Sequence, residues 1–430
     1  STLVAPLLSS NMCAYQTLVK NAAQLCQVAA NHERVVVGKA MGHVSTIANG
    51  YMVIDQGIIR FVGSQAEFEA SEYAGAEYES VVDATGRVVM PGLVDAHTHP
   101  VFEGDRCHEF SMKLEGASYI DIHKAGGGIG FTVKHVREAD DETLATHLEE
   151  RIQRLLASGT TCMEAKTGYG LDEETELKML RVINSVKTKP STDMTMVSTF
   201  LGAHSVPKGS TQDEATETVI GTIPKLASVG GCDQIDVFLE KGVFDGPHTR
   251  RILEAGVQHG MAINFHGDEL NYMAGAEMAA DLKARAMSHC ECVTPEGMAQ
   301  MAKEEVVGVV LPTTSYILRI HPAPARQMIE AGVPLALASD FNPNAPCYSM
   351  PLTMHLGCIF LGISMAEALV ASTINAAASI GRADTHGSLE TGKQGDFIVL
   401  DASAPSWEHI IYRLGDNVVD SVYVKGRKVV

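Results

Sequence analysis

Two histidines separated by one residue, His97 and His99, are the first residues in this sequence whose spacing suggests chemistry. They follow an apolar run, MPGLVDA, that has the character of a buried strand. In an extended chain residues i and i+2 point to the same side, so both imidazole rings should project together. Two neutral imidazoles form half of a site for a divalent metal ion. The alternative is a chance pair of surface histidines, and the apolar run before them argues against it.

Polar residues also close three later apolar runs. His266 and Glu269 lie in the segment HGDE, His289 follows ARAMS, and Asp340 follows PLALAS. Imidazole and carboxylate groups bind metal ions and also transfer protons near neutral pH. Each residue alone has a simpler explanation, as a core histidine with satisfied hydrogen bonds or as a carboxylate that caps a turn. Their shared position at the ends of apolar runs favours one common site.

Neighbouring parallel strands would bring these residues together. Strand-like runs alternate along the chain with segments of helical periodicity, such as residues 140–159, which begin with acidic residues. The eight predicted strands are 93–99, 160–166, 194–204, 235–241, 262–269, 284–290, 306–314 and 334–342. This alternation is typical of an α/β fold, and eight such units predict a (β/α)8 TIM-like barrel. Its active site is expected at the carboxyl ends of the strands, where the polar residues fall.

The two ends of the chain have a different character from the middle. Both contain short β-branched runs separated by glycine-containing turns, which predict strands and hairpins. Each end offers too few strands for a stable sheet of its own. We therefore expect one small β-sandwich domain built from both ends. The predicted division is 1–90 and 386–430 for the small domain and 91–385 for the barrel.

The segment VMPGLVDAHTH, residues 89–99, resembles the first-strand signature of the amidohydrolase superfamily. The similarity extends over the barrel and both halves of the small domain. It is carried by HTHPVFEGDR (97–106), EAKTGYGLD (164–172), FLGAHSVP (200–207), IDVFLEKGVF (235–244), FHGDE (265–269) and SDFNP (339–343). The resemblance implies metal-dependent hydrolysis of a cyclic amide. The combination of Arg106, TGYG and GAH is most similar to the branch that opens 4-imidazolone-5-propanoate to N-formimino-L-glutamate.

The resemblance also implies a ligand set and a set of catalytic residues. It implies one divalent or trivalent metal ion per chain, zinc or iron, with the ligands His97, His99, His266 and Asp340. A second metal bridged by a carboxylated lysine is the alternative within the superfamily, and Lys241 lies near the required position. Proton transfer is assigned to Glu269, His289 and Asp340, and the division of steps among the three is left open.

Contacts to the substrate are expected from the loops that follow the strands. A guanidinium group matches a carboxylate with two parallel bonds, so Arg106 is expected to bind the propanoate arm. The resemblance implies further contacts from Tyr169, His204, Glu269, Asn342, Asn344 and Ala345. At the last two positions the family pattern usually has glycine and a small hydroxyl residue, so the sequence departs from it there. The departure puts in doubt the contacts at these positions and not the chemistry.

Two other functions compete with this prediction. An aminohydrolase that deaminates a purine, pyrimidine or triazine ring would use the same metal ligands, but Arg106 suits an anionic side chain better than a neutral base. A barrel that has lost catalysis should lack at least one of the ligands, and all of them are present.

The composition limits the possible partners and the compartment. The 430 residues carry 33 Lys and Arg against 52 Asp and Glu, a formal net charge of −19, which argues against nucleic acid or an anionic membrane as a partner. The nine cysteines are scattered singly, which favours reduced thiols in the cytoplasm. The first ten residues lack the basic leader of a signal peptide, and no run approaches the ~20 apolar residues of a membrane helix. The resemblance suggests a homodimer.

Overall fold

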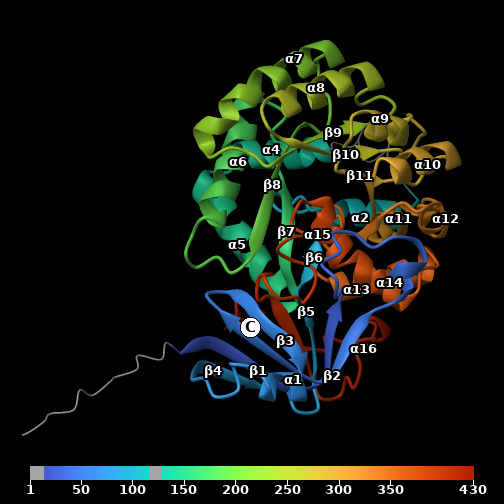
Figure 1. Cartoon of the computed structure of the whole chain (residues 1–430). Coiled ribbons are helices and arrows are strands. Elements are labelled where there is room, and N and C mark those ends of the chain that lie inside the picture. Colours follow the sequence, from blue (N-terminus) through green and yellow to red (C-terminus); the bar gives the residue numbers. More distant parts are fainter. Residues whose placement is uncertain (1–13, 117–126) are drawn as a thin grey trace, which may run out of the picture.

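The computed structural model describes residues 14–116 and 127–430 of the chain. Figure 1 shows two parts, a barrel surrounded by helices and a smaller sheet domain where the blue and red ends of the chain meet. The predicted fold class, an α/β barrel with a small β-domain built from both chain ends, is confirmed. The division at residues 90 and 385 stays a prediction.

Eight strands form the barrel sheet and follow one another in chain order. Each pairs in parallel with the next, and each lies within or close to a run predicted from the sequence. They are β6 (Leu93–Asp95), β7 (Thr160–Lys166), β8 (Thr195–Ala203), β9 (Gln234–Leu239), β10 (Ala262–Gly267), β11 (Ala286–His289), β12 (Val307–Val310) and β13 (Leu335–Leu337). The first and last strands meet just beyond their ends, where Thr98 bridges Phe341 and the His99 N–H donates to the Phe341 carbonyl at 2.7 Å.

Helices connect the strands and cover the outside of the barrel (Figure 1). Asp140 caps α5 by accepting a hydrogen bond from the Thr143 N–H, and two further acidic residues fill the first turn, as the sequence indicates. The helices of the barrel are α2 (Cys107–Leu114), α4 (Ile129–Glu138), α5 (Asp141–Ala157), α6 (Glu173–Lys187), α7 (Gln212–Thr222), η2 (Ile223–Val229), α8 (Gly246–Gln258), α9 (Gly275–Asp281), α10 (Pro295–Lys303), α11 (Pro312–Leu318), α12 (Ala325–Ala331), α13 (Met350–Phe360), α14 (Met365–Ala371) and α15 (Ile374–Ser379).

The small domain is one sheet of eight strands drawn from both chain ends. Its strands are β1 (Tyr15–Val28), β2 (Ser45–Asp55), β3 (Ile58–Ser64), β4 (Tyr78–Asp83), β5 (Val88–Pro91), β14 (Phe397–Leu400), β15 (Val419–Val424) and β16 (Arg427–Lys428). Strand β14 joins the two ends by pairing antiparallel with β5. Side chains from several of these strands, among them β2 and β14, share one buried cluster that forms the core of the small domain. Three short helices, η1 (Gly38–Gly42), α1 (Gln65–Glu69) and α16 (His409–Tyr412), lie in the terminal segments.

Gly92 stands between β5 of the small domain and β6 of the barrel. A Cβ atom at this position would come within 2.1 Å of the Thr161 hydroxyl oxygen at the start of β7. Only glycine fits this approach, which explains the glycine just before the first barrel strand. The junction fixes where β6 enters the barrel, and therefore where His97 and His99 emerge from it.

Candidate metal centre and substrate pocket

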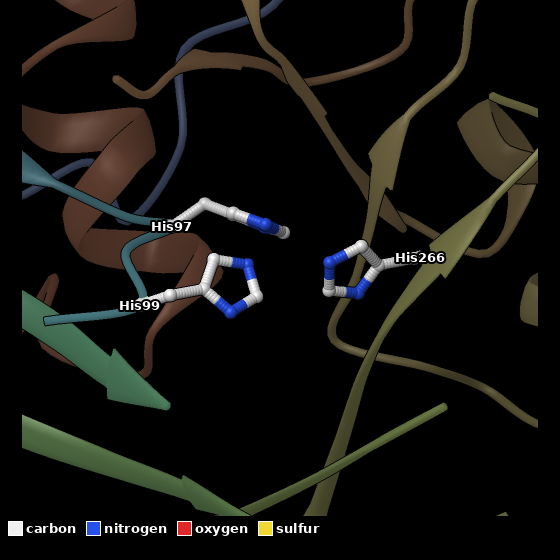
Figure 2. Close-up of side chains that lie close together, drawn as sticks. All are labelled: His97, His99 and His266. Atoms are coloured by element: carbon white, nitrogen blue, oxygen red, sulfur yellow. The ribbon is translucent and has the colours of Figure 1, made fainter. Parts of the chain in front are cut away.

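Three histidines come together at the carboxyl ends of the barrel strands. His97 and His99 follow β6, His266 lies in β10, and their rings point toward one another (Figure 2). One nitrogen from each ring falls within 4.8 Å of the other two, and all three side chains are buried. The predicted projection of His97 and His99 to the same side is therefore observed.

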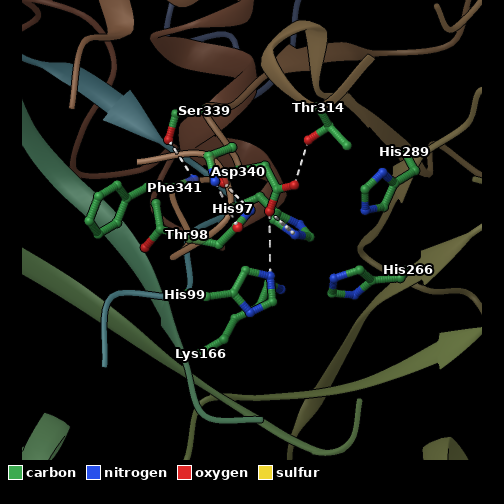
Figure 3. A network of polar contacts seen from close by, with 12 residues as sticks. His97, Thr98, His99, Lys166, His266, His289, Thr314, Ser339, Asp340 and Phe341 are labelled. Atoms are coloured by element: carbon green, nitrogen blue, oxygen red, sulfur yellow. Dashed lines mark hydrogen bonds and ion pairs between the residues drawn. The ribbon is translucent and has the colours of Figure 1, made fainter. Parts of the chain in front are cut away.

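Asp340, which follows β13, lies beside two of these histidines. Its Oδ1 lies 3.6 Å from His97 Nε2 and 3.5 Å from His99 Nε2 (Figure 3). Ligand atoms of a tetrahedral zinc ion lie about 3.3 Å apart, so this spacing suits Asp340 as a co-ligand of His97 and His99. The Thr314 hydroxyl donates to Asp340 Oδ2 and fixes the carboxylate. Asp340 adopts a φ of +47°, a left-handed conformation that a non-glycine residue keeps only where its surroundings impose it.

The chemistry of the donor set fits a metal ion. Both ring nitrogens of His97 are buried without a hydrogen-bond partner among the described residues, an arrangement that costs free energy unless a ligand binds them. Burial holds the pKa of His97, His99 and His266 well below the usual histidine range, and the nearby charge of Lys166 adds to this. The rings are therefore neutral and offer lone pairs to a cation.

A buried ion cluster beneath the site orients His266. Asp236, on β9, accepts hydrogen bonds from His266 Nδ1 at 2.9 Å and from the His266 backbone N–H at 3.0 Å. The other oxygen of Asp236 accepts from Lys166 Nζ at 2.7 Å, and Lys166 also contacts Glu164 Oε2 at 2.8 Å. Because Nδ1 carries the proton toward Asp236, Nε2 of His266 is left to bind a metal ion.

This ion cluster was not predicted from the sequence. Its signal was present in the run TTCMEAK, where Glu164 and Lys166 are two charged residues at i and i+2 in a strand whose seven residues are all buried. Charged side chains on the inner side of a barrel strand are rare unless they are paired. Asp236 lies in the predicted fourth strand, and only the parallel pairing of strands places it beside them.

Glu269 and His289 lie next to the histidine cluster, and the His289 ring centroid is 5.1 Å from that of His266. His289 Nε2 is 3.5 Å from Glu269 Oε2, and His289 Nδ1 is 3.7 Å from Glu291 Oε2. Burial raises the pKa of Glu269 and the nearby His289 lowers it, so that the resulting pKa is about 8. Burial alone would lower the pKa of His289, but Glu269 and Glu291 raise it to about 10. The pair therefore holds a proton for transfer at neutral pH.

A pocket of about 460 Å³ opens from the histidine cluster toward the surface. Tyr169 and His204 form part of its wall, as predicted, together with apolar side chains such as Phe238. His204 stacks on His99 with ring centroids 4.9 Å apart, and its Nδ1 hydrogen-bonds the Gly168 carbonyl at 3.0 Å. Burial lowers the pKa of His204 to about 4, so the neutral ring donates from Nδ1 and presents Nε2 to the pocket.

Arg106 lines the pocket, but the structure adds a partner that the sequence did not reveal. Its Nε and Nη2 donate to the two carboxylate oxygens of Glu109 at 2.9 and 2.8 Å, and both side chains are buried. Glu109 also accepts the Gly128 N–H at 2.8 Å. Glu109 therefore fixes one edge of the guanidinium group, and the opposite edge remains for a ligand.

The residues after Asp340 build a tight turn at the pocket edge. Asn342 Oδ1 accepts the N–H groups of Asn344 and Ala345 at 2.8 and 3.1 Å, and both asparagines line the pocket. Ala345 is buried and lines a neighbouring cavity instead, so its contact with the substrate stays a prediction. Lys113, which the sequence analysis did not select, also lines the pocket and donates to Asn344 Oδ1.

Lys241 lies outside the metal centre. Strand β9 ends at Leu239, and Lys241 is exposed while its neighbour Glu240 is buried. The histidine cluster does not include it. This placement favours the surface role expected for Lys241 over a bridge between two metal ions.

Comparison with known proteins identifies the family. The model of the amidohydrolase family matches residues 251–429. A probable imidazolonepropionase from Nematostella vectensis is 50% identical over 426 residues, which cover 96% of this chain and 98% of that protein. The chain belongs to the imidazolonepropionase family. The human member, also described as a probable imidazolonepropionase, is 47% identical over 96% of this chain and 98% of its own length.

Solved structures outside the imidazolonepropionase family share the fold. A zinc-bound adenosine deaminase from Xanthomonas campestris superimposes with a TM-score of 0.72 at 18% identity, covering 96% of this chain and 93% of that one. An atrazine chlorohydrolase from Arthrobacter aurescens, complexed with zinc, gives 0.70 at 13% identity, covering 96% and 95%. At these identities the likeness extends to the fold alone.

Two further observations concern the predicted compartment. None of the helices in the described parts of the chain has the length and apolar character needed to cross a membrane. The eight cysteines within the described residues are free thiols. The first ten residues, which the sequence analysis judged not to be a signal peptide, lie outside the described residues. The cytoplasmic location stays a prediction.

Proposed function

We propose that this chain hydrolyses the cyclic amide of 4-imidazolone-5-propanoate and releases N-formimino-L-glutamate. The observation that carries the proposal is the convergence of His97, His99, His266 and Asp340 at a pocket that Arg106 also lines. Membership of the imidazolonepropionase family supports the same reaction.

The four ligands would hold one metal ion, and zinc or iron suits three imidazoles and a carboxylate. The zinc in two proteins of the same fold favours zinc. A metal ion held there would lower the pKa of a water molecule from ~15.7 toward ~7 and would polarise the ring carbonyl. Asp236 and Thr314 keep two of the ligands in the orientation that this requires.

The protein residues around the metal centre would move the protons. The water oxygen bonds to the ring carbonyl carbon, and Asp340 accepts the proton that the water loses. His289, held between Glu269 and Glu291, stabilises the negative charge that develops on the carbonyl oxygen. Glu269, whose pKa burial raises, would donate the proton that it shares with His289 to the ring nitrogen as the carbon–nitrogen bond breaks. Each such proton transfer is typically worth ~10²–10⁴-fold in rate.

The remaining pocket residues would position the substrate. Tyr169 and His204 would lie along the ring, Asn342 and Asn344 would border it from the turn after Asp340, and Arg106 would bind the propanoate arm, since all five line the pocket. Deamination of a purine, pyrimidine or triazine ring is less favoured, because a neutral base has no group to pair with Arg106.

The decisive experiment is to incubate purified, metal-analysed protein with 4-imidazolone-5-propanoate and to follow N-formimino-L-glutamate by mass spectrometry. Hydantoin and guanine serve as control substrates. Turnover of guanine in preference to the imidazolone would replace the proposal with the deaminase alternative.

We also propose that the protein is a homodimer, as the resemblance suggests. Light scattering coupled to size-exclusion chromatography tests this, and a mass near the 46.0 kDa of one chain would contradict it.

A further inference from the structure

The charge balance in the outer part of the pocket points to a cation other than Arg106. Arg106 and Glu109 are bonded through two parallel contacts and are both buried, so together they carry no net charge. Burial opposes ionisation of Glu109, but the bonds from Arg106 bring its pKa below the usual value, so the carboxylate stays charged. An anionic ligand that reaches Arg106 therefore finds hydrogen-bond donors at a fixed angle, but the ion pair of Arg106 and Glu109 has no net charge to attract it. The net electrostatic attraction must come from another cation.

Lys113 lies on the same side of α2, seven positions after Arg106, which is about two helical turns. It lines the pocket together with Arg106 and Asn344 and is partly buried. Among the described residues, the hydrogen-bond partner of Lys113 Nζ is the neutral side-chain oxygen of Asn344. Lys113 thus brings a positive charge that this partner does not cancel.

We propose that Lys113 is a specificity-determining residue that selects the carboxylate of the substrate, with Arg106 fixing the geometry of the same group. The proposal rests on the proposed function for the identity of the reaction. Arg106, held by Glu109, offers its remaining edge at a fixed angle. Lys113 carries a compact charge on a flexible stem and follows the carboxylate. Asn344 keeps the ammonium group over the pocket until a carboxylate replaces its amide oxygen.

The proposed role of Lys113 accounts for the side chain found at position 344. Asn344 stands where the resemblance predicted a glycine, and its side chain spans the distance to α2 and holds Lys113. Protein burial strengthens a contact between Lys113 and a carboxylate, because charges interact more strongly away from bulk water. Burial and the neighbouring Arg106 also lower the pKa of Lys113, which a bound anion would reverse.

The test compares an anionic and a neutral ligand in four variants. Lys113→Met removes the charge, Lys113→Arg keeps it, Asn344→Asp pairs it with a carboxylate, and Arg319→Met removes an exposed cation from another part of the pocket edge. The first readout is kcat/KM for 4-imidazolone-5-propanoate and for its propanamide analogue. The second is the calorimetric Kd for imidazole-4-propanoate and imidazole-4-propanamide, which needs no turnover.

Lys113→Met is expected to weaken both readouts for the anionic compounds by about 10–100-fold and to change the amides by less than about twofold. Asn344→Asp should show the same selective loss for the anionic compounds, although the lysine is still present. Lys113→Arg should keep most of the preference for the anionic compounds, and Arg319→Met should keep all of it. Equal losses for acid and amide, or an equal loss of selectivity in Arg319→Met, would overturn the proposal. If the wild type binds the imidazole acid in a Lys113-dependent way but does not open the imidazolone, the proposed reaction fails while the role of Lys113 stands.

Discussion

Two lysines, one in the pocket wall and one fully buried near the histidine cluster, have different surroundings. Lys166 lies beneath the metal centre, is fully buried, and contacts two carboxylates, Glu164 and Asp236. Lys113 lies near the surface and contacts one neutral amide. The positive charge of Lys166 is balanced by the two carboxylates that contact it, so Lys166 has no charge to offer a ligand. Its role is to hold the side chains of the site in place. The charge of Lys113 is not cancelled by its amide partner, so it is available to a ligand. The partners of a buried cation, more than its residue type, therefore indicate what it does.

The largest effect is expected at the metal ligands themselves. His97→Ala or His266→Ala should remove both the metal and turnover, because each deletes one of the four proposed ligands. The barrel should remain folded, since its large apolar core does not depend on the ion. Metal analysis after dialysis, kcat and circular dichroism measure the three quantities. A variant that keeps one equivalent of metal would show that the deleted residue is not a ligand.

Glu269→Gln and His289→Ala should separate proton transfer from metal binding. Both variants are expected to keep the metal and to lose about 10²–10⁴-fold in kcat, roughly 3–5 kcal/mol of barrier. Single-turnover rates together with metal content test this. Loss of metal before loss of activity would make the altered residue a ligand, and the assignment of proton transfer would be wrong.

Lys166→Met should weaken metal binding by about 10–100-fold, because Asp236 loses the contact that holds its carboxylate against His266. Competition with a chromogenic chelator measures the affinity. Lys393→Met is the matched control, since Lys393 is also buried and paired with a carboxylate, Glu390, away from the pocket.

Glu164→Gln tests whether the buried ion cluster affects metal binding by orienting His266. This variant disturbs the ion cluster but leaves the contact between Lys166 and Asp236 in place. It should therefore bind metal within about threefold of the wild type. If Glu164→Gln weakens metal binding as much as Lys166→Met does, the cluster acts only through general stability and not by orienting His266.

Among the variants expected to lose function, Arg106→Met should lose the least. Because Glu109 already occupies one edge of the guanidinium, we expect a loss of about tenfold in kcat/KM for the anionic substrate, from one or two charge-assisted bonds. Removing Arg106 also leaves Glu109 buried without its partner, so urea denaturation should show reduced stability. The double variant Arg106→Met with Glu109→Gln should recover stability but not substrate selectivity. Recovery of both would exclude a substrate contact by Arg106.

The parts of the molecule that the sequence predicted well are those controlled by local pattern. All eight barrel strands are visible as apolar runs that end in turn residues, and the candidate residues His97, His99, His266 and Asp340 follow or close such runs. The strand that precedes His97 was predicted to continue to residue 99, but β6 ends at Asp95. The two histidines still project together, because the bridge between Thr98 and Phe341 keeps the segment extended.

The parts that the sequence did not predict depend on contacts between distant segments. Asp236 meets Lys166 because strands β7, β8 and β9 follow one another in the sheet, and Lys113 meets Asn344 across 231 positions of the chain. Glu109 is only three positions from Arg106, yet nothing in the local pattern shows that both side chains are buried and bonded. Residue type and spacing can suggest a charge but do not indicate what neutralises it.

The pairing of β5 with β14 also has a consequence for how the chain is made. On the ribosome β5 emerges early, and its partner in the sheet follows roughly 300 residues later, which at ~5–20 residues per second is a delay of roughly 15–60 s. During this interval the N-terminal strands expose an unpaired, apolar edge of the kind that promotes aggregation. A nascent chain therefore needs a chaperone, or early packing of β5 against the barrel, until its last strands arrive.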